Sequence, residues 1–120
     1  MPMSTELLLL DVAALEAALQ KFADERDWKQ YHSPKNLAMA LTGEVGELVE
    51  IFQWLTEEQS KKVAQDKNTA RAVRDEIADV LLFLVRLSSV LGVDLNEAVV
   101  TKLAANAAKY PAGDSTPKRS

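Results

Sequence analysis

The chain has 120 residues, no cysteine, 48% hydrophobic and 27% charged residues, and a net charge of −4. This length and balance are typical of one globular domain, and the missing cysteines exclude disulfide bonds and thiolate zinc sites. The negative charge disfavours a nucleic-acid polymer as partner, because such binding requires clustered Lys and Arg. We see no secretion signal and no apolar run of the ~20 residues that a membrane span needs, so we expect a cytoplasmic protein without a membrane partner.

The first half of the chain shows helical rather than alternating periodicity. The first helix is predicted from Leu7 to Asp24, with an apolar stripe at three- and four-residue steps. Ser33 and Pro34 provide an N-cap and a proline at the first helical position, so the second helix is predicted from Pro34 to about Trp54. The segment Thr56 to Gln59 resembles a capping box that opens a short helical turn.

The second half continues the helical pattern, so we predict an all-α fold. The next long helix spans roughly Thr69 to Leu91 and is apolar nearly all round after Ile77, which predicts a subunit interface. Gly92 suits the left-handed position after a helix, and Asp94 is a candidate N-cap. The last helix is predicted from Leu95 to about Lys109.

Composition divides the chain into one domain and a tail. Residues 1–112 contain all the predicted helices, and we expect them to form a single all-α domain. Residues 113–120 are small, polar and basic, and they offer no apolar surface to bury. We therefore expect this tail to be disordered.

Two pairs of acidic residues repeat the same three-residue step on two predicted helices. The pairs are Glu44 with Glu47 and Glu76 with Asp79, each among apolar neighbours. Residues three apart share a helix face, so two antiparallel helices can gather all four carboxylates. Such a cluster repels itself and loses hydration, which a divalent cation relieves. Because all four candidate ligands are oxygen donors, the cluster favours Mg²⁺ over zinc, with Mn²⁺ as a substitute. Glu50 is a weaker candidate that would lie in the outer shell of the metal. The alternative is a solvated acidic helix face.

Two further groups of polar and aromatic residues accompany the acidic pairs. The first group flanks the second helix and has two tryptophans that can clamp a flat ring, or that simply anchor the core. Its members are Trp28, His32, Asn36 and Trp54. The second group lies near the end of the last helix and offers donors to phosphates, or merely places cations at the negative end of a helix dipole. Its members are Lys102, Asn106, Lys109 and Tyr110.

Four short segments together point to a known family. They are residues 32–37 (HSPKNL), 44–48 (EVGEL), the Glu76-x-x-Asp79 step, and residues 106–111, which contain Asn-x-x-Lys-Tyr-Pro. The combination resembles the MazG-like all-α nucleoside triphosphate pyrophosphohydrolases, particularly the dCTP pyrophosphatase branch. The resemblance covers roughly residues 22–111, and the spacing between the two acidic steps is its most specific part.

The resemblance implies a fold, an assembly and an activity. It implies a four-helix bundle assembled as a homotetramer, a dimer of dimers. It also implies Mg²⁺-dependent hydrolysis of a nucleoside triphosphate, dCTP or a modified dCTP, to the monophosphate and pyrophosphate, as house-cleaning of the nucleotide pool. In that family, residues matching the four acidic positions hold the metal. Residues matching the first polar and aromatic group, which begins with Trp28, lie around the nucleotide. Residues matching the second group, which begins with Lys102, contact its phosphates.

The resemblance also suggests a catalytic role and one departure. Glu47 matches the carboxylate expected to orient or deprotonate the attacking water while touching the metal. Leu19 and Phe83 stand where some dCTP-selective relatives have polar or hydroxylated side chains. The base preference is therefore open.

Two other classes of protein remain as alternatives. A ferritin-like di-iron bundle also gathers carboxylates between helices, but it needs a Glu-x-x-His step on two helices, and His32 is the only histidine. A helical interaction module without catalysis would use its acidic face for solubility and its apolar third long helix as an oligomer interface. Stabilisation by magnesium with nucleotide, by ferrous ion, or by neither separates the three classes.

Overall fold

The computed structural model describes residues 10–113, and that part of the chain is all-helical, without strands. The elements in chain order are α1 (Val12–Glu25), the 3-10 turn η1 (Lys29–Tyr31), α2 (Pro34–Phe52), α3 (Glu57–Ser60), α4 (Ala70–Leu91) and α5 (Leu95–Lys109). The predicted all-α class is confirmed. Residues 114–120 of the predicted tail lie outside the described residues, and the single-domain boundary stays a prediction.

Local capping signals set most helix boundaries where the sequence predicts them. The Ser33 hydroxyl accepts a hydrogen bond from the backbone N–H of Asn36 at 3.2 Å, which starts α2. Thr56 forms the predicted capping box with the side chain and backbone of Gln59. Gly92 ends α4 with φ of 72°, a left-handed conformation that glycine adopts without a side-chain clash.

The first helix begins later than predicted. It starts at Val12, and the Asp11 carboxylate accepts a hydrogen bond from the Ala14 N–H at 2.9 Å. Leu10 and Asp11 therefore precede the helix, because a capping residue has non-helical backbone angles; residues 7–9 lie outside the described residues. Similarly, α2 ends at Phe52, before the predicted Trp54.

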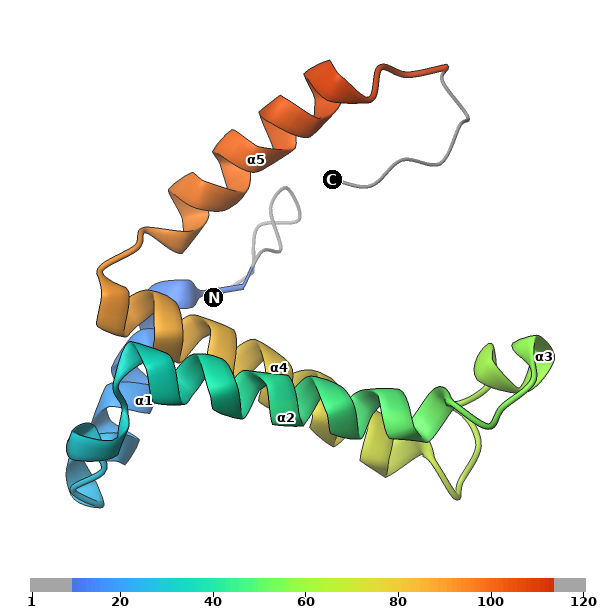
Figure 1. Ribbon diagram of the computed structural model, residues 1–120, viewed down its shortest axis with the longest axis horizontal. Coiled ribbons are helices and arrows are strands. Elements are labelled where there is room, and N and C mark those ends of the chain that lie inside the picture. The colour runs from blue at the N-terminus through green and yellow to red at the C-terminus, as the bar shows by residue number, and fades with distance from the viewer. Residues whose placement is uncertain (1–9, 114–120) are drawn as a thin grey trace, which may run out of the picture.

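The main packing of the chain is α2 against α4, with α1 against the second half of α4. Figure 1 shows α2 and α4 running side by side, α3 at their far end, and α5 diverging from the other helices. The predicted four-helix bundle is therefore not closed within the single chain. It stays a prediction for the assembled protein.

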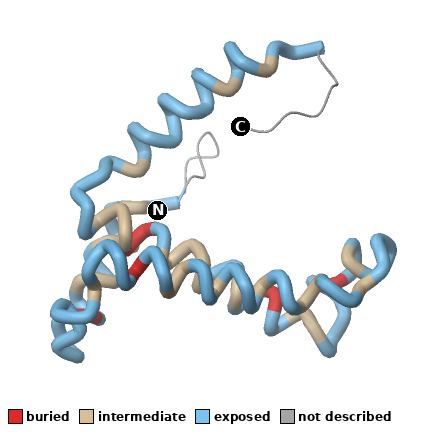
Figure 2. Tube along the Cα trace, viewed as in Figure 1, coloured by how far each residue is buried: buried red, intermediate tan, exposed pale blue. Residues whose placement is uncertain are grey.

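Few side chains are fully buried in the single chain. The buried apolar residues of the described part are Ala23, Leu37, Val63, Val73 and Val85, and they are scattered along the chain rather than gathered in one core (Figure 2). Large apolar side chains of α4 and α5 are exposed instead, among them Ile77 at 56% and Val100 at 67%. Such surface usually marks an interface. No helix of the described residues is long and apolar enough to cross a membrane.

The Ser33 cap provides a test of the fold. Replacing Ser33 with Ala removes the hydrogen bond to the Asn36 N–H, so the free energy of unfolding should fall by about 1 kcal/mol. Urea denaturation followed by circular dichroism measures this change. Ser33→Asp is the control, because an aspartate caps as well as a serine, and it should keep nearly all of the stability. Equal losses in both variants would refute the capping role.

Candidate functional site

Three of the four predicted metal ligands meet where α2 packs against α4. Glu44 and Glu47 lie one turn apart on α2, and Glu76 reaches them from α4. One carboxylate oxygen from each residue lies within 4.8 Å of the others. Asp79 is not part of this group of oxygens; it follows Glu76 by one turn of α4. The helix pairing thus produces the predicted carboxylate cluster, although with three members rather than four.

The acidic cluster is electrostatically unfavourable unless a proton or a cation joins it. Burial, a hydrogen bond with Glu44 and the charge of Glu47 raise the pKa of Glu76 to about 7. Burial also raises the pKa of Glu44, opposed by its hydrogen bond with Glu76 and reinforced by the charges of Glu47 and Asp79. One oxygen each of Glu44 and Glu76 is buried without a hydrogen-bond partner among the described residues. Unpartnered carboxylate oxygens fit a hard divalent cation.

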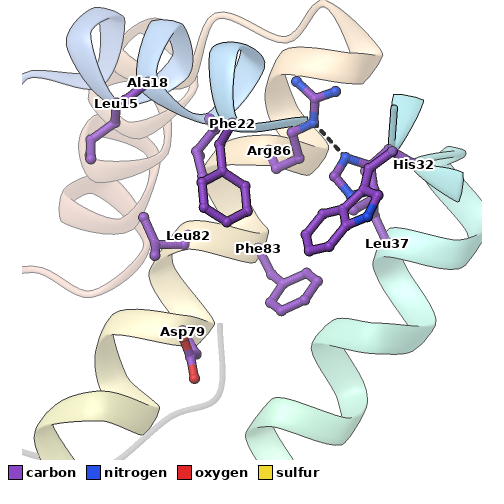
Figure 3. A pocket seen from close by; sticks show the side chains of 11 residues that line it. Leu15, Ala18, Phe22, His32, Leu37, Asp79, Leu82, Phe83 and Arg86 are labelled. Carbon is purple, nitrogen blue, oxygen red and sulfur yellow. Dashed lines mark hydrogen bonds between the residues drawn. The ribbon is translucent and has the colours of Figure 1, made fainter. Parts of the chain in front are cut away.

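A pocket of about 480 Å³ opens beside this cluster. Its volume is within the range of small-molecule sites. Figure 3 shows Asp79 at one end and Arg86 with His32 at the other, with Leu82 and Phe83 between them. Most of the wall is apolar, and it includes Leu15, Leu19, Phe22 and Leu37. The pocket therefore has a carboxylate at one end and a basic group at the other, with an apolar wall that contains aromatic side chains between them.

The register of α4 explains this polarity. Asp79, Leu82, Phe83 and Arg86 are spaced at steps of three, four and seven residues, so they share one helix face. Seven residues of α-helix rise about 10.5 Å, which sets the axial separation of the acidic and basic ends. One face of one helix thus carries a metal-ligand candidate, an apolar platform and a cation.

The turn after α1 brings aromatic side chains to the same pocket. Asp27 adopts a φ of 54°, which aspartate tolerates better than most residues. The chain consequently folds back, and the Trp28 N–H donates to the Ala23 carbonyl at 2.9 Å. Trp28 packs edge-on against Phe22, with ring centroids 5.5 Å apart, and lies 6.2 Å from the His32 ring. Phe22, Trp28 and His32 all line the pocket.

The predicted nucleotide-binding group is only partly assembled. Trp28 and His32 line the pocket. The Asn36 amide instead donates to the Tyr31 carbonyl at 3.2 Å and ties α2 to the preceding turn. Trp54 is 86% exposed, does not line the pocket, and lies just beyond the end of α2. The structure thus gathers half of this group, and the roles of all four residues stay predictions.

The predicted phosphate-binding group lies on α5 and at its end. Figure 1 shows this helix diverging from α2 and α4, and none of its residues lines the pocket beside the acidic cluster. The Lys109 ammonium lies 5.3 Å from the Tyr110 ring centroid, and the Asn106 side-chain oxygen is buried without a hydrogen-bond partner in the described part. Lys102 occupies the preceding turns of the same helix. Within one chain this group does not reach the acidic cluster.

One polar residue of the pocket was missed by reasoning from the sequence. Arg86 is only 4% exposed, and it donates from Nε to His32 Nδ1 at 3.0 Å and from Nη1 to Gln20 Oε1 at 2.8 Å. The signal that identifies it is an arginine in the mostly apolar second half of α4, seven residues after Asp79. Leu19 and Phe83, the positions that depart from some relatives, also line the pocket.

Comparisons with known proteins identify a family and relatives that the chain resembles. The family model of the MazG-like family matches residues 40–118. The chain is 44% identical over 108 residues to dCTP pyrophosphatase 1 of Bos taurus and of Mus musculus, and over 109 residues to that of Homo sapiens. These matches cover 90%, 90% and 91% of the chain but 62% of each relative. The chain therefore spans less than two thirds of the length of the curated relatives it matches.

A solved structure provides a second comparison. The crystal structure of a pyrophosphatase from Archaeoglobus fulgidus superposes with a TM-score of 0.77 at 38% sequence identity. The match covers 90% of this chain and 99% of that one. The predicted family is confirmed: a chain with these acidic steps, this helix pairing and these relatives belongs to the MazG-like family.

Proposed function

We propose that this protein hydrolyses a nucleoside triphosphate, dCTP or a modified dCTP, to the monophosphate and pyrophosphate. The observation that carries the proposal is the position of Asp79, one turn from Glu76 and at the end of the ring-bearing pocket. A metal-bound triphosphate at the acidic cluster would thus extend its nucleoside into the pocket. Relatives named dCTP pyrophosphatase and a structural neighbour named pyrophosphatase support this reaction. Its role would be house-cleaning of the nucleotide pool in the cytoplasm.

Magnesium is the cofactor that the acidic residues fit. Glu44, Glu47, Glu76 and Asp79 would hold it, with Mn²⁺ as a substitute, because the cluster offers only oxygen ligands and two of its buried oxygens lack partners among the described residues. Bound there, the ion would neutralise triphosphate charge and lower the pKa of a water. The same residues do not suit a ferritin-like iron site, since no histidine of the described part joins the cluster.

Glu47 is the residue that we assign to proton transfer. It is the exposed member of the cluster, whereas Glu44 and Glu76 are partly buried, and the pKa values of those two are raised. Its carboxylate would take a proton from the attacking water. The water oxygen forms a bond to the α-phosphorus, and the bond from the α-phosphorus to the oxygen that bridges the α- and β-phosphates breaks. Pyrophosphate leaves with the electron pair.

The remaining predicted contacts come partly from the pocket of the single chain and partly from the assembled protein. Trp28 and His32 would contact the base from within the pocket, with Asn36 and Trp54 around the nucleotide. Lys102, Asn106, Lys109 and Tyr110 would meet the phosphates once α5 is brought to a bundle. Exposed apolar residues on α4 and α5 support association of several copies. We propose that they form a homotetramer, built as a dimer of dimers, in which four-helix bundles are completed.

The assigned role of Glu47 predicts a loss of activity without a loss of folding. Glu47→Gln keeps the size of the side chain but cannot accept the proton, so the turnover number should fall at least about a hundredfold. Pyrophosphate release, measured across a panel of nucleoside triphosphates with magnesium, provides the test. Glu58→Gln is the matched control, since Glu58 is exposed on α3 and pairs with Lys61. Full activity in Glu47→Gln would remove the assignment.

The raised pKa of Glu76 predicts a pH dependence of the metal-free protein. Its pKa rises from 4.5 to about 7 on folding, so the stability that its proton contributes is complete below pH 4.5 and is lost as the pH rises through 7. Chelator-treated protein should therefore melt at a lower temperature at pH 7.5 than at pH 5. Added magnesium should raise the melting temperature at pH 7.5 and so reduce this difference.

Glu76→Gln is the control for this measurement. A glutamine resembles the protonated acid, so the variant should show a flatter pH profile than the original protein and a smaller response to magnesium. A melting temperature that is insensitive to magnesium at pH 7.5 in the unaltered protein would argue against a metal at the cluster.

A further inference from the structure

Arg86 is the one buried charged side chain in the described part of the chain, and the proposed mechanism does not use it. It is 4% exposed, lines the pocket at the end opposite Asp79, and forms no ion pair among the described residues. A buried cation without a carboxylate partner is costly, and such a residue is retained where a ligand or a network compensates it. The surroundings of Arg86 provide a network and also leave donors for a ligand.

A hydrogen-bond network holds the Arg86 guanidinium in one orientation. Its Nε donates to His32 Nδ1 at 3.0 Å, and its Nη1 donates to Gln20 Oε1 at 2.8 Å. The Gln20 amide in turn donates to Asp24 at 2.8 Å, so its oxygen is the atom left to accept from the arginine. The network uses two of the five N–H groups of the guanidinium. It leaves the others for a ligand.

The network also determines what His32 can offer. A guanidinium cannot accept a hydrogen bond, so His32 Nδ1 must be the unprotonated nitrogen of the ring. The proton of the neutral imidazole then sits on Nε2. The indole of Trp28, the third polar side chain at this end, is likewise a donor. Away from Asp79, the polar side chains of the pocket therefore present hydrogen-bond donors and no acceptor.

The spacing along α4 sets which part of a nucleotide meets these donors. Phosphates near Asp79 would place a planar ring against Leu82 and Phe83, and its far edge toward Arg86, about two turns further along the helix. A base that presents adjacent acceptors at that edge satisfies the donors. A base with an N–H there opposes a donor with a donor and leaves both unpaired, which is costly in a buried site.

We propose that Arg86, oriented by Gln20 and His32, is a specificity-determining residue that selects cytosine over uracil and thymine. The inference rests on the proposed nucleotide hydrolysis and concerns its substrate. Cytosine presents two adjacent acceptors, N3 and O2, to the fork of the guanidinium, an arrangement that arginine pairs with bidentately. Uracil and thymine carry a proton on N3 between their two carbonyl groups. A substituent at C5 of cytosine leaves the N3 and O2 acceptors unchanged, so a modified cytosine remains a substrate.

A purely structural role for Arg86 makes a different prediction. If the residue only ties α1 to α4 and to the turn before α2, its loss weakens the pocket for every nucleotide alike. A role in reading the base changes the ratio between two nucleotides whose bases differ in hydrogen-bonding groups at N3 and C4 but hardly in size. The pair dCTP and dUTP has this property, since the two bases have nearly the same size and shape.

The experiment compares kcat/KM for dCTP and dUTP in the original protein and in Arg86→Met. We expect the original protein to prefer dCTP at least about tenfold, and the ratio to fall toward one in Arg86→Met. Arg86→Lys keeps the charge but lacks the planar fork, so its ratio should fall as well. Arg71→Met is the matched control: Arg71 is on the same helix, its side chain is 96% exposed, and it lies outside the pocket.

Binding measurements keep the test independent of turnover. Calorimetric titration of the metal-free protein with dCMP and dUMP should show the same preference and the same loss in Arg86→Met. If Arg86→Met does not fold, as judged by circular dichroism, the Arg86→Lys ratio decides. An unchanged ratio in the folded variants, or equal use and binding of the two nucleotides by the original protein, overturns the role of Arg86 but leaves the hydrolase proposal intact. Absence of hydrolysis across the whole panel rejects the hydrolase proposal, and the dCMP and dUMP titrations then decide the role of Arg86.

Discussion

The packing of α2 against α4 is the contact on which the rest of the structure depends. It places Glu44 and Glu47 opposite Glu76, with one oxygen of each within 4.8 Å of the others. The face of α4 that follows Glu76 then lines the pocket. Carboxylates at this separation repel one another, so the apolar contacts of the two helices must hold them in place. Burial, and after it the neighbouring Glu44 and Glu47, raises the pKa of Glu76. Because the folded chain holds the carboxylates close despite their repulsion, binding of a cation there would stabilise the folded state.

Local signals made most of the secondary structure predictable from the sequence. Ser33, Thr56 and Gly92 act within a few residues of their own positions, and the helix ends they set agree with the prediction. The acidic step of α2 and that of α4 were predictable for the same reason, because a three-residue spacing implies a shared face. The position of Asp79 relative to the other three carboxylates was not, since it depends on how far α4 is rotated and shifted against α2.

Other features required long-range information that periodicity does not contain. The hydrogen bond from Arg86 to His32 joins residues 54 positions apart, and the one to Gln20 joins residues 66 apart. From the sequence, Arg86 merely interrupts an apolar helix. The direction taken by α5 was equally hidden, because the cap at Asp94 starts the helix but does not determine what it packs against. Predictions for Lys102 and its neighbours therefore depend on assembly rather than on the fold of one chain.

The sparse interior of the single chain bears on how the protein behaves on dilution. With Val85 as the largest fully buried side chain of the described part, and with Ile77 and Val100 facing outward, one copy has little apolar contact to offset the entropy of folding. If copies complete each other's interiors, as proposed, they fold and associate in a single equilibrium, and the melting temperature should rise with protein concentration. Substitutions on the outward apolar faces would then act by weakening association, at positions remote from every carboxylate.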